Sequence, residues 1–304
     1  IMADIKNVIL DTDVGPDCDD AAALALTTIY TRKSGARLLG VTHCTSCPWG
    51  VGAIRAILKW YGCEEAAVGT LADRDLLDDE EATKYNRALA MTLSEEERRA
   101  PDCLPLTREL LAGQEDGSVD MIAIGPLRNI AKLLTSPADG ISPLTGRELI
   151  ARKVRRLTLM AGEFTPDCDH AEWNVLMDMP SARIVAAEWP TEIVYCGFEV
   201  GFPVVTLKEP NELNPENPVR TAYKLHSAGK GRMSWDLCTV QQALCSRPDL
   251  YELSGEGRID IDEKGVTRWH ADEHGRHQFI KLAAAPEVVA RALEADITAF
   301  DAKR

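Results

Sequence analysis

The chain has 304 residues, of which 45% are hydrophobic and 27% are charged, and its formal net charge at pH 7 is −14. This acidic balance argues against a nucleic-acid partner, because phosphate binding requires clustered Lys and Arg side chains. No apolar run approaches the roughly 20 residues that span a bilayer and no leader peptide is evident, so no membrane partner is expected.

The first predicted elements surround a group of acidic residues. An apolar run at 8–10 is followed by a turn that contains Gly and Pro, and then by a run rich in Ala and Leu. This order predicts a short buried strand, a tight loop and a helix. Asp11 and Asp13, two residues apart at the strand end, point to the same side. Asp19 and Asp20 lie at the predicted helix N-terminus, which favours negative charge.

Five carboxylates lie within ten residues of this segment and repel one another. A hard divalent cation would relieve that repulsion, and both calcium and magnesium prefer oxygen ligands. The only soft ligand atom in the segment is the sulfur of Cys18, which weakens the case for zinc. An alternative is that the acids only cap the helix and form the turn. That alternative accounts for the acids of 17–20, but not for Asp11 and Asp13 at the end of an apolar strand.

Beyond this segment, predicted strands alternate with predicted helices. Strands are expected at residues 37–42, 66–69, 119–124, 153–160 and 192–197, and helices at 50–61, from 127, 181–187, 239–244 and 286–300. Residues 71–99 are predicted to form a loop and a solvated helix, and residues 258–269 a β-hairpin. The alternation predicts a single α/β domain, residues 1–304, with a mostly parallel central sheet, helices on both faces and a C-terminal hairpin. Ligands of such sheets bind beyond the carboxyl ends of the strands.

The acidic segment resembles the signatures of two known families. Asp-x-Asp-x-Gly at residues 11–15, followed by Asp-Asp-Ala at 19–21, resembles the metal signature of the nucleoside hydrolases, the inosine-uridine-preferring type and its bacterial relatives. The haloacid-dehalogenase phosphatases also end their first strand in Asp-x-Asp, followed by Val or Thr. A phosphatase of that family would be expected to show a later strand-end Ser or Thr and then a Lys, and neither stands out in this sequence.

Three later motifs match the nucleoside hydrolases in the same order along the chain. They are Gly-Pro-Leu at 125–127, Glu-Trp-Asn at 172–174 and Trp-Asp at 235–236. The resemblance implies that Asp13 is the catalytic base and that Asp11 supports the site from behind. It also implies a Ca²⁺ site whose ligands are Asp13, Asp20, the main-chain carbonyl of Ile124, and Asp236.

The resemblance further implies which residues contact the nucleoside. Asp19 and Asn174 would hold the ribose hydroxyls and Glu172 the 5′ side of the sugar, while Met160 and Trp235 complete the substrate site. An amide and a carboxylate suit this role because each forms several directed hydrogen bonds to a diol. At the position of Trp235, just before Asp236, familiar members of the nucleoside hydrolase family carry a His that acts near the leaving base. An indole can stack on a purine, but it cannot donate a proton as an imidazolium does.

For some residues the sequence allows two roles, one in the substrate pocket and one outside it. The acidic loop is two residues longer than the compact form of the motif, so either Asp17 or Asp19 could contact ribose. His43 and Glu199 each follow a predicted strand, and each could face the pocket or serve only as a surface or turn residue. The histidines of 270–277 fall in a predicted loop, where a second metal site is not expected.

Together the motifs predict Ca²⁺-dependent hydrolysis of the N-glycosidic bond of ribonucleosides, giving ribose and free nucleobase. Two alternatives remain: a haloacid-dehalogenase-like phosphatase with Asp11 as nucleophile, and a non-catalytic ribose- or nucleoside-binding relative, suggested by the missing His beside Asp236. The resemblance also implies a part in purine or pyrimidine salvage and a homo-oligomer, a dimer or a tetramer. Nine scattered cysteines predict reduced thiols and a cytoplasmic location.

Overall fold

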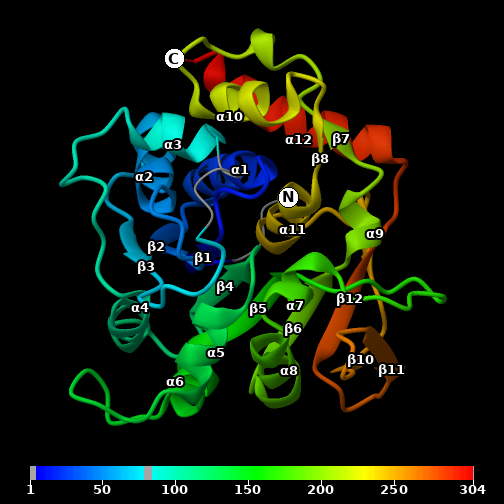
Figure 1. Ribbon diagram of the computed structural model, residues 1–304. Helices are drawn as coiled ribbons and strands as arrows, with labels where there is room; N and C mark the ends of the chain where they lie inside the picture. Colours follow the sequence, from blue (N-terminus) through cyan, green and yellow to red (C-terminus); the bar gives the residue numbers. More distant parts are fainter. Residues whose placement is uncertain (1–4, 79–83, 304) are drawn as a thin grey trace.

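The computed structural model describes residues 5–78 and 84–303 and shows a layer of strands between two layers of helices (Figure 1). At its centre, strand β1 (Asn7–Thr12) is buried at every residue, as expected for an apolar run in the middle of a sheet. Helix α1 (Asp19–Ser34) follows after a short loop and ends at Gly35, whose φ of 77° suits glycine. The strand, loop and helix predicted around the acidic segment are therefore confirmed.

The other strands of the main sheet are β2 (Arg37–His43), β3 (Ala67–Thr70), β4 (Val119–Ala123), β5 (Val154–Met160), β6 (Glu192–Cys196), β9 (Tyr251–Leu253), β10 (Gly257–Ile261), β11 (Thr267–Ala271) and β12 (His277–Leu282). Their order is β11-β10-β12-β6-β5-β4-β1-β2-β3, and β9 pairs with β12. Neighbours from β12 to β3 run parallel, whereas β10 is antiparallel to both β11 and β12. A separate ribbon pairs β7 (Val205–Thr206) with β8 (Arg232–Met233).

Helices cover both faces of the sheet. Besides α1 they are α2 (Gly50–Tyr61), α3 (Lys84–Ala90), α4 (Cys103–Ala112), α5 (Arg128–Thr135), α6 (Gly146–Lys153), α7 (Trp173–Met177), α8 (Met179–Glu188), α9 (Phe198–Gly201), α10 (Pro218–Ser227), α11 (Trp235–Leu244) and α12 (Pro286–Asp301), with a 3₁₀ turn at Pro210–Glu212. No helix among the described residues combines the length and the apolarity that crossing a bilayer requires.

Two apolar cores lie on opposite sides of the sheet. Side chains of β1 alternate between them, with Leu10 in one core and Ile9 in the other. The first core packs under α1, α2, α10, α11 and α12, and the second under α4, α5, α6 and α8. The predicted fold class, a mostly parallel sheet with helices on both faces, is confirmed.

The C-terminal hairpin is also confirmed, and it forms part of the main sheet. Strands β10 and β11 pair antiparallel, and β12 joins them to the rest of the sheet by lying parallel to β6. The prediction that the late histidines lie in a loop is wrong for two of them, because His270 belongs to β11 and His277 begins β12. Within the described part of the chain, neither belongs to a group of three possible metal ligands.

Two helices differ from their predicted form. Helix α11 begins at Trp235 rather than Thr239, since Asp236 suits the first turn of a helix although it interrupts the apolar pattern. Helix α3 lies in the segment predicted to be solvated, yet it buries the side chain of Tyr85. Residues 79–83 of that segment lie outside the described residues.

Candidate active site

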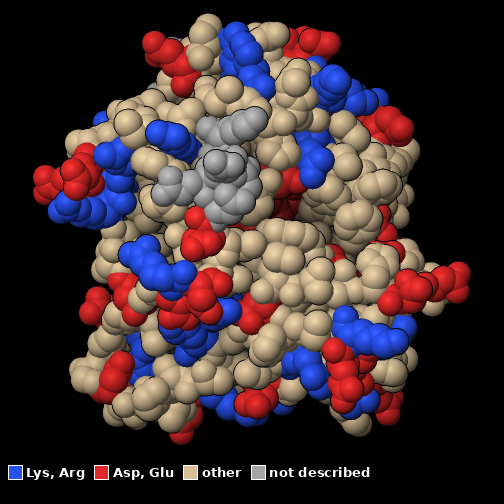
Figure 2. All heavy atoms as spheres, viewed as in Figure 1, with Lys and Arg blue, Asp and Glu red and all other residues tan. Residues whose placement is uncertain are grey.

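A pocket of about 320 Å³ opens where the carboxyl ends of β1, β4 and β5 meet the N-terminus of α11. Figure 2 shows carboxylate atoms inside a hollow near the middle of this face. The pocket is lined by Asp13, Pro16, Asp17, Asp19, Asp20, Ile124, Met160, Glu172, Trp173, Asn174, Phe198, Arg232, Trp235 and Asp236. Every residue predicted to bind metal or substrate is among them. Asp11, predicted to lie behind the site, is not.

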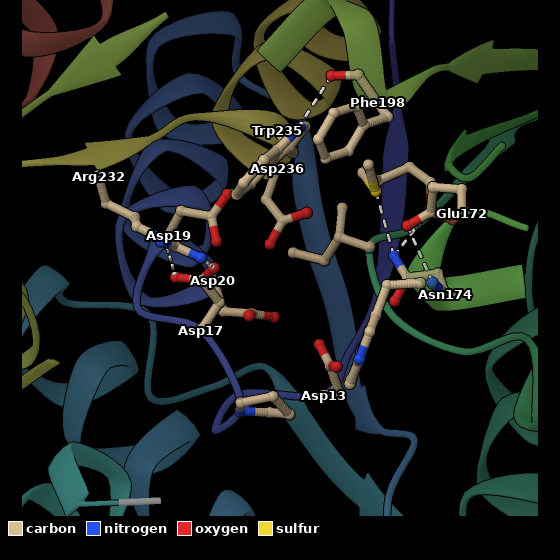
Figure 3. A pocket seen from close by; sticks show the side chains of 14 residues that line it. Asp13, Asp17, Asp19, Asp20, Glu172, Asn174, Phe198, Arg232, Trp235 and Asp236 are labelled. Atoms are coloured by element: carbon tan, nitrogen blue, oxygen red, sulfur yellow. Dashed lines mark hydrogen bonds and ion pairs between the residues drawn. The ribbon is translucent and has the colours of Figure 1, made fainter. Parts of the chain in front are cut away.

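Four carboxylates from two distant parts of the chain meet inside the pocket. Asp13 follows β1, Asp19 and Asp20 begin α1, and Asp236 lies in the first turn of α11. Carboxylate oxygens of Asp19, Asp20 and Asp236 lie within 4.8 Å of one another. The carboxyl group of Asp13 lies beside that of Asp20. Figure 3 shows these side chains projecting toward the same space. We call Asp13, Asp19, Asp20 and Asp236 the acid cluster.

Burial and neighbouring negative charge raise the pKa of every carboxyl group in the acid cluster. Burial is the main cause at Asp13, whose pKa is raised to about 7, and the charge of Asp19 adds to it. The pKa values of the other three are raised well above the usual range, by burial first and then by the charges of neighbouring aspartates. Arg232, the one cationic side chain that the described part of the chain contributes to the lining, forms its ion pair with Asp17 instead.

This arrangement fits a bound divalent cation. Four buried carboxylates would each be costly to ionise without a nearby positive charge. Among the described residues, no Lys or Arg forms an ion pair with any member of the acid cluster. The donors are all oxygens, which is the ligand set of calcium and magnesium. Cys18, the only candidate soft ligand in the segment, lies beside Asp17 and His226 and does not line the pocket.

Asp11 lies behind the pocket and is held there by hydrogen bonds to one of its two carboxylate oxygens. Its Oδ1 accepts hydrogen bonds from the hydroxyl of Thr42 and, at 2.8 Å, from Nδ2 of Asn129. Asn129 Nδ2 also donates to the main-chain carbonyl of His43 at 3.2 Å. Asp11 is 1% exposed and absent from the pocket lining. A substrate in the pocket could therefore not meet Asp11 as a nucleophile, which removes the physical basis of the phosphatase alternative.

On the other side of the pocket, α7 brings an amide and a carboxylate to the lining. Asn174 donates from Nδ2 to the main-chain carbonyl of Met160 at 3.0 Å, and its Oδ1 has no hydrogen-bond partner among the described residues. Glu172 is the N-cap of α7 and accepts hydrogen bonds from the main-chain N–H groups of Gly162, Asn174 and Val175 at 3.1, 2.9 and 3.3 Å. Burial raises the pKa of Glu172 to about 7. Glu172 is thus held rigidly by the backbone at the pocket wall.

Trp235 forms an aromatic wall at the start of α11. Its Nε1 donates to the main-chain carbonyl of Phe198 at 3.0 Å, and the two rings lie 5.4 Å apart between centroids. Gly201 makes this close packing possible, because a Cβ added there would lie 2.3 Å from the Cα of Trp235. The indole is therefore fixed in position by its neighbours.

Asp17 is separate from the acid cluster although it lines the same pocket. Both of its carboxylate oxygens accept hydrogen bonds from Arg232, with Nε at 2.9 and 2.8 Å. Asp19 instead accepts a hydrogen bond from the main-chain N–H of Asp236 at 3.1 Å. Of the two candidates in the longer loop, the structure brings Asp19, not Asp17, into the acid cluster.

Two other candidates, His43 and Glu199, do not line the pocket. His43 is fully buried, with its ring nitrogens near the hydroxyl groups of Thr45 and Thr70. Glu199 accepts a hydrogen bond from the main-chain N–H of Phe164 at 3.2 Å. Both residues serve the local structure rather than the pocket surface.

Three residues near the site carry no motif that predicts them: Arg232 and Phe198, which line the pocket, and Tyr85, which contacts its loop. Arg232 lies on a two-residue strand with no pattern of its own, and Tyr85 lies in a strongly charged segment. The only signal that could have indicated Arg232 was its position three residues before Trp235.

Comparison with known proteins identifies the family. The family model for the inosine-uridine preferring nucleoside hydrolases matches residues 8–300. The chain belongs to this family. The haloacid-dehalogenase alternative is therefore wrong, in agreement with the inaccessible position of Asp11.

Similar proteins include a non-specific ribonucleoside hydrolase, RihC, of Klebsiella pneumoniae. It is 28% identical to this chain over 197 residues, which cover 51% of this chain and 60% of the relative. The chain thus matches less than two thirds of the length of this curated relative.

Solved structures share the fold over nearly the whole chain. An inosine-uridine preferring nucleoside hydrolase from Bacillus anthracis is 19% identical, with a TM-score of 0.72, and the match covers 99% of this chain and 100% of that one. The type III effector protein XopQ, solved in complex with adenosine diphosphate ribose, is 14% identical, with a TM-score of 0.75. The match covers 99% of this chain and 95% of XopQ. At these identities the likeness shows the fold alone.

Proposed function

We propose that this protein hydrolyses the N-glycosidic bond of ribonucleosides to give ribose and free nucleobase, with Ca²⁺ as its cation. The observation that supports this most strongly is the acid cluster, which faces Asn174 across a pocket in a member of the nucleoside hydrolase family. One wall thus offers oxygens for a cation and the other offers polar groups for a sugar.

The cation would be held by Asp13, Asp20, the main-chain carbonyl of Ile124 and Asp236, all of which line the pocket. A divalent cation supplies positive charge that neutralises these carboxylates and lowers the pKa of a coordinated water molecule. Asp13 is the residue proposed to accept a proton, because it directly follows the end of β1 and its side chain lines the pocket beside the other acids of the cluster.

The remaining residues would bind and orient the nucleoside. Asp19 and Asn174 hold the ribose 2′ and 3′ hydroxyls, so that C1′ is fixed while positive charge develops on the sugar. Glu172 lies on the 5′ side, and Met160 lines the sugar site between them. Trp235 provides the apolar wall against which the leaving base packs.

A second candidate function is binding of a nucleoside or ribose compound without turnover. It is favoured by Trp235, which stands where a His would protonate the leaving base, and XopQ offers a structural neighbour solved with adenosine diphosphate ribose. The acid cluster favours hydrolysis, because a cation held there could also coordinate the attacking water.

One assay tests the proposal. Ribose release is measured from a panel of purine and pyrimidine nucleosides with Ca²⁺, with a chelator, and with Ca²⁺ restored after the chelator. We expect release that is lost with chelator and recovered with Ca²⁺, whereas recovery with Mg²⁺ alone would contradict the choice of calcium. Calorimetric binding of nucleosides with no release at high protein concentration would instead establish the binding function.

We further propose a part in purine or pyrimidine salvage, in the cytoplasm and as a homo-oligomer. The nine cysteines are all free thiols in the structure, which suits a reducing compartment. Light scattering coupled to size-exclusion chromatography tests the oligomeric state, with a mass of about twice or four times the 33.4 kDa chain expected.

A further inference from the structure

Departure of the nucleobase requires a group that stabilises negative charge, and the pocket offers few such groups. The imidazole expected beside Asp236 is absent, and His43 does not line the pocket. The indole N–H of Trp235 and the side-chain amide of Asn174 already donate to main-chain carbonyls at 3.0 Å. Among the described residues of the lining, Arg232 is the only one with a positively charged side chain.

Arg232 lies next to the indole that marks the expected position of the base. Its Cζ is 5.3 Å from the ring centroid of Trp235, within the range of a cation–π contact. In Figure 3 its guanidinium group lies at the edge of the pocket, near Asp17 and Asp19. Its Nε and Nη2 donate to Asp17, whereas Nη1 forms no hydrogen bond with any described residue. The two N–H bonds of Nη1 are therefore free of partners among the described residues, on a side chain that lines the pocket.

Asp17 is itself held in place by several contacts. Its main-chain carbonyl accepts a hydrogen bond from the hydroxyl of Tyr85 at 2.5 Å, and its Oδ1 accepts one from the N–H of Cys18 at 2.6 Å. The carbonyl of Pro16, one residue earlier, lies 3.2 Å from Nε2 of His226. Helices α3 and α10 thus fix the loop that carries Asp17, and the ion pair in turn fixes the guanidinium group.

We propose that Arg232 is a catalytic residue that stabilises the departing nucleobase through hydrogen bonds from Nη1, and that Asp17 positions it. This rests on the proposed hydrolysis. The bond between C1′ and the base nitrogen breaks, and its electron pair passes to the base. The water oxygen forms the new bond to C1′ and releases its proton to Asp13, while the base takes its proton from solvent. A guanidinium group stays charged throughout, so it acts as a hydrogen-bond donor and not as an acid.

The test compares substrates that differ in how much help the leaving group needs. Turnover of inosine and of p-nitrophenyl riboside is measured for the wild type and for Arg232→Gln, since p-nitrophenolate departs with little stabilisation. We expect kcat/KM for inosine to fall by about 10- to 100-fold, the usual effect of losing a hydrogen bond to a charged group, and kcat/KM for the riboside to fall by less than about threefold. Equal losses on the two substrates would mean a structural role only and would overturn the proposal.

Two further variants separate the roles of the ion pair. Asp17→Asn should show the same selective loss, and the double variant should be no worse than Arg232→Gln alone, because both changes act through one group. Additive losses would contradict a positioning role for Asp17. The matched control is Arg128→Gln, which breaks a similar ion pair with Asp178 outside the pocket lining and should not change the ratio between the substrates.

A binding measurement keeps this inference distinct from the proposed function. If the wild type hydrolyses neither substrate, the proposed hydrolysis fails, and the affinities of inosine and ribose are then compared by calorimetry. Contact with the base predicts that Arg232→Gln weakens inosine binding about tenfold or more and leaves ribose binding unchanged. An equal change for both ligands would overturn the assignment of Arg232 to the base.

Discussion

The main-chain N–H of Asp236 donates a hydrogen bond of 3.1 Å to Oδ2 of Asp19, and so connects the N-termini of α11 and α1. Both helices point the positive end of their dipole at the acid cluster, which favours the ionised carboxylates. The same contact places an acid from residue 236 beside acids from the first twenty residues. Removal of one acid should therefore weaken cation binding and reduce the stabilisation that the cation gives to the fold.

Replacement of Asp236 by Asn should weaken Ca²⁺ binding and remove most of the stabilisation that Ca²⁺ gives. A cation that binds only the folded state adds about 2.7 kcal/mol to the free energy of unfolding at one hundred times its Kd. Thermal unfolding with and without Ca²⁺ measures this effect, and Asp120→Asn, a buried acid paired with Arg155 away from the pocket, is the control. A Ca²⁺ response in Asp236→Asn equal to that of the wild type would exclude this residue as a ligand.

Replacement of Asp13 by Ala should abolish hydrolysis while the fold is kept. Loss of a positioned proton acceptor lowers turnover by roughly 10²- to 10⁴-fold, and loss of a cation ligand adds to this. Ribose release and circular dichroism are measured on the same preparation. Near-normal release from a folded Asp13→Ala protein would rule out its role as base.

Replacement of Gly125 by Ala should reduce activity by displacing Asp13. A Cβ at Gly125 would lie 2.7 Å from Sγ of Cys44 and 3.0 Å from Cβ of Asp13, so a neighbour must move. A displacement of about 1 Å in a catalytic group can lower turnover by roughly 10²-fold. Gly140→Ala is the matched control, because nothing lies within 4 Å of its added Cβ. Full activity in Gly125→Ala would show that the strand end tolerates the extra methyl group.

Acid should destabilise the protein through His277, which begins strand β12 and does not line the pocket. Nδ1 of His277 accepts a hydrogen bond from the N–H of Ile259 at 2.9 Å, which requires an unprotonated nitrogen. Burial lowers its pKa to about 4; Asp260 opposes this, while Arg258 and Arg276 add to it.

The folded state therefore binds fewer protons than the unfolded state, whose His has a pKa near 6.5. The stability contributed by neutral His277 is complete above about pH 6.5 and is lost as the pH falls toward 4, by roughly 2 kcal/mol at pH 5. Urea unfolding at pH 7 and pH 5 measures this loss, which His277→Gln should reduce. His274 lies on an exposed turn, so His274→Gln should lose as much unfolding free energy between pH 7 and pH 5 as the wild type. Equal losses in the wild type, His277→Gln and His274→Gln would contradict the assignment of this pH dependence to His277.

The sequence predicted those parts of the site whose residues lie close together in the chain, within one strand–loop–helix segment. Asp13, Asp19 and Asp20 belong to one strand–loop–helix unit, so a single segment indicates their common position. Helix α2 was predicted with the bounds that it has, because a regular apolar stripe at residues 50–61 gives a clear periodicity. The motifs after β4 and β5 were added through the resemblance to the nucleoside hydrolases, and the fold brings them to the pocket because the carboxyl ends of parallel strands share one edge.

What the sequence could not predict depends on pairing between distant segments. Arg232 reaches the pocket only because β8 pairs with β7 and because Asp17, far away in the chain, accepts its guanidinium group. The buried role of Tyr85 is hidden in a charged segment whose composition is typical of a solvated surface. The parallel pairing of β12 with β6 joins residues far apart in sequence, and no local pattern specifies such a neighbour.

The dependence of the pocket on both ends of the chain has a consequence for biosynthesis. While the ribosome has made only the first two hundred residues, the growing chain holds Asp13, Asp19 and Asp20 but has no Asp236 to complete the ring of oxygens around them. The nascent protein thus has to tolerate uncompensated acids until helix α11 has been made, and under the proposed function its capacity to hold a cation would arise only at that point.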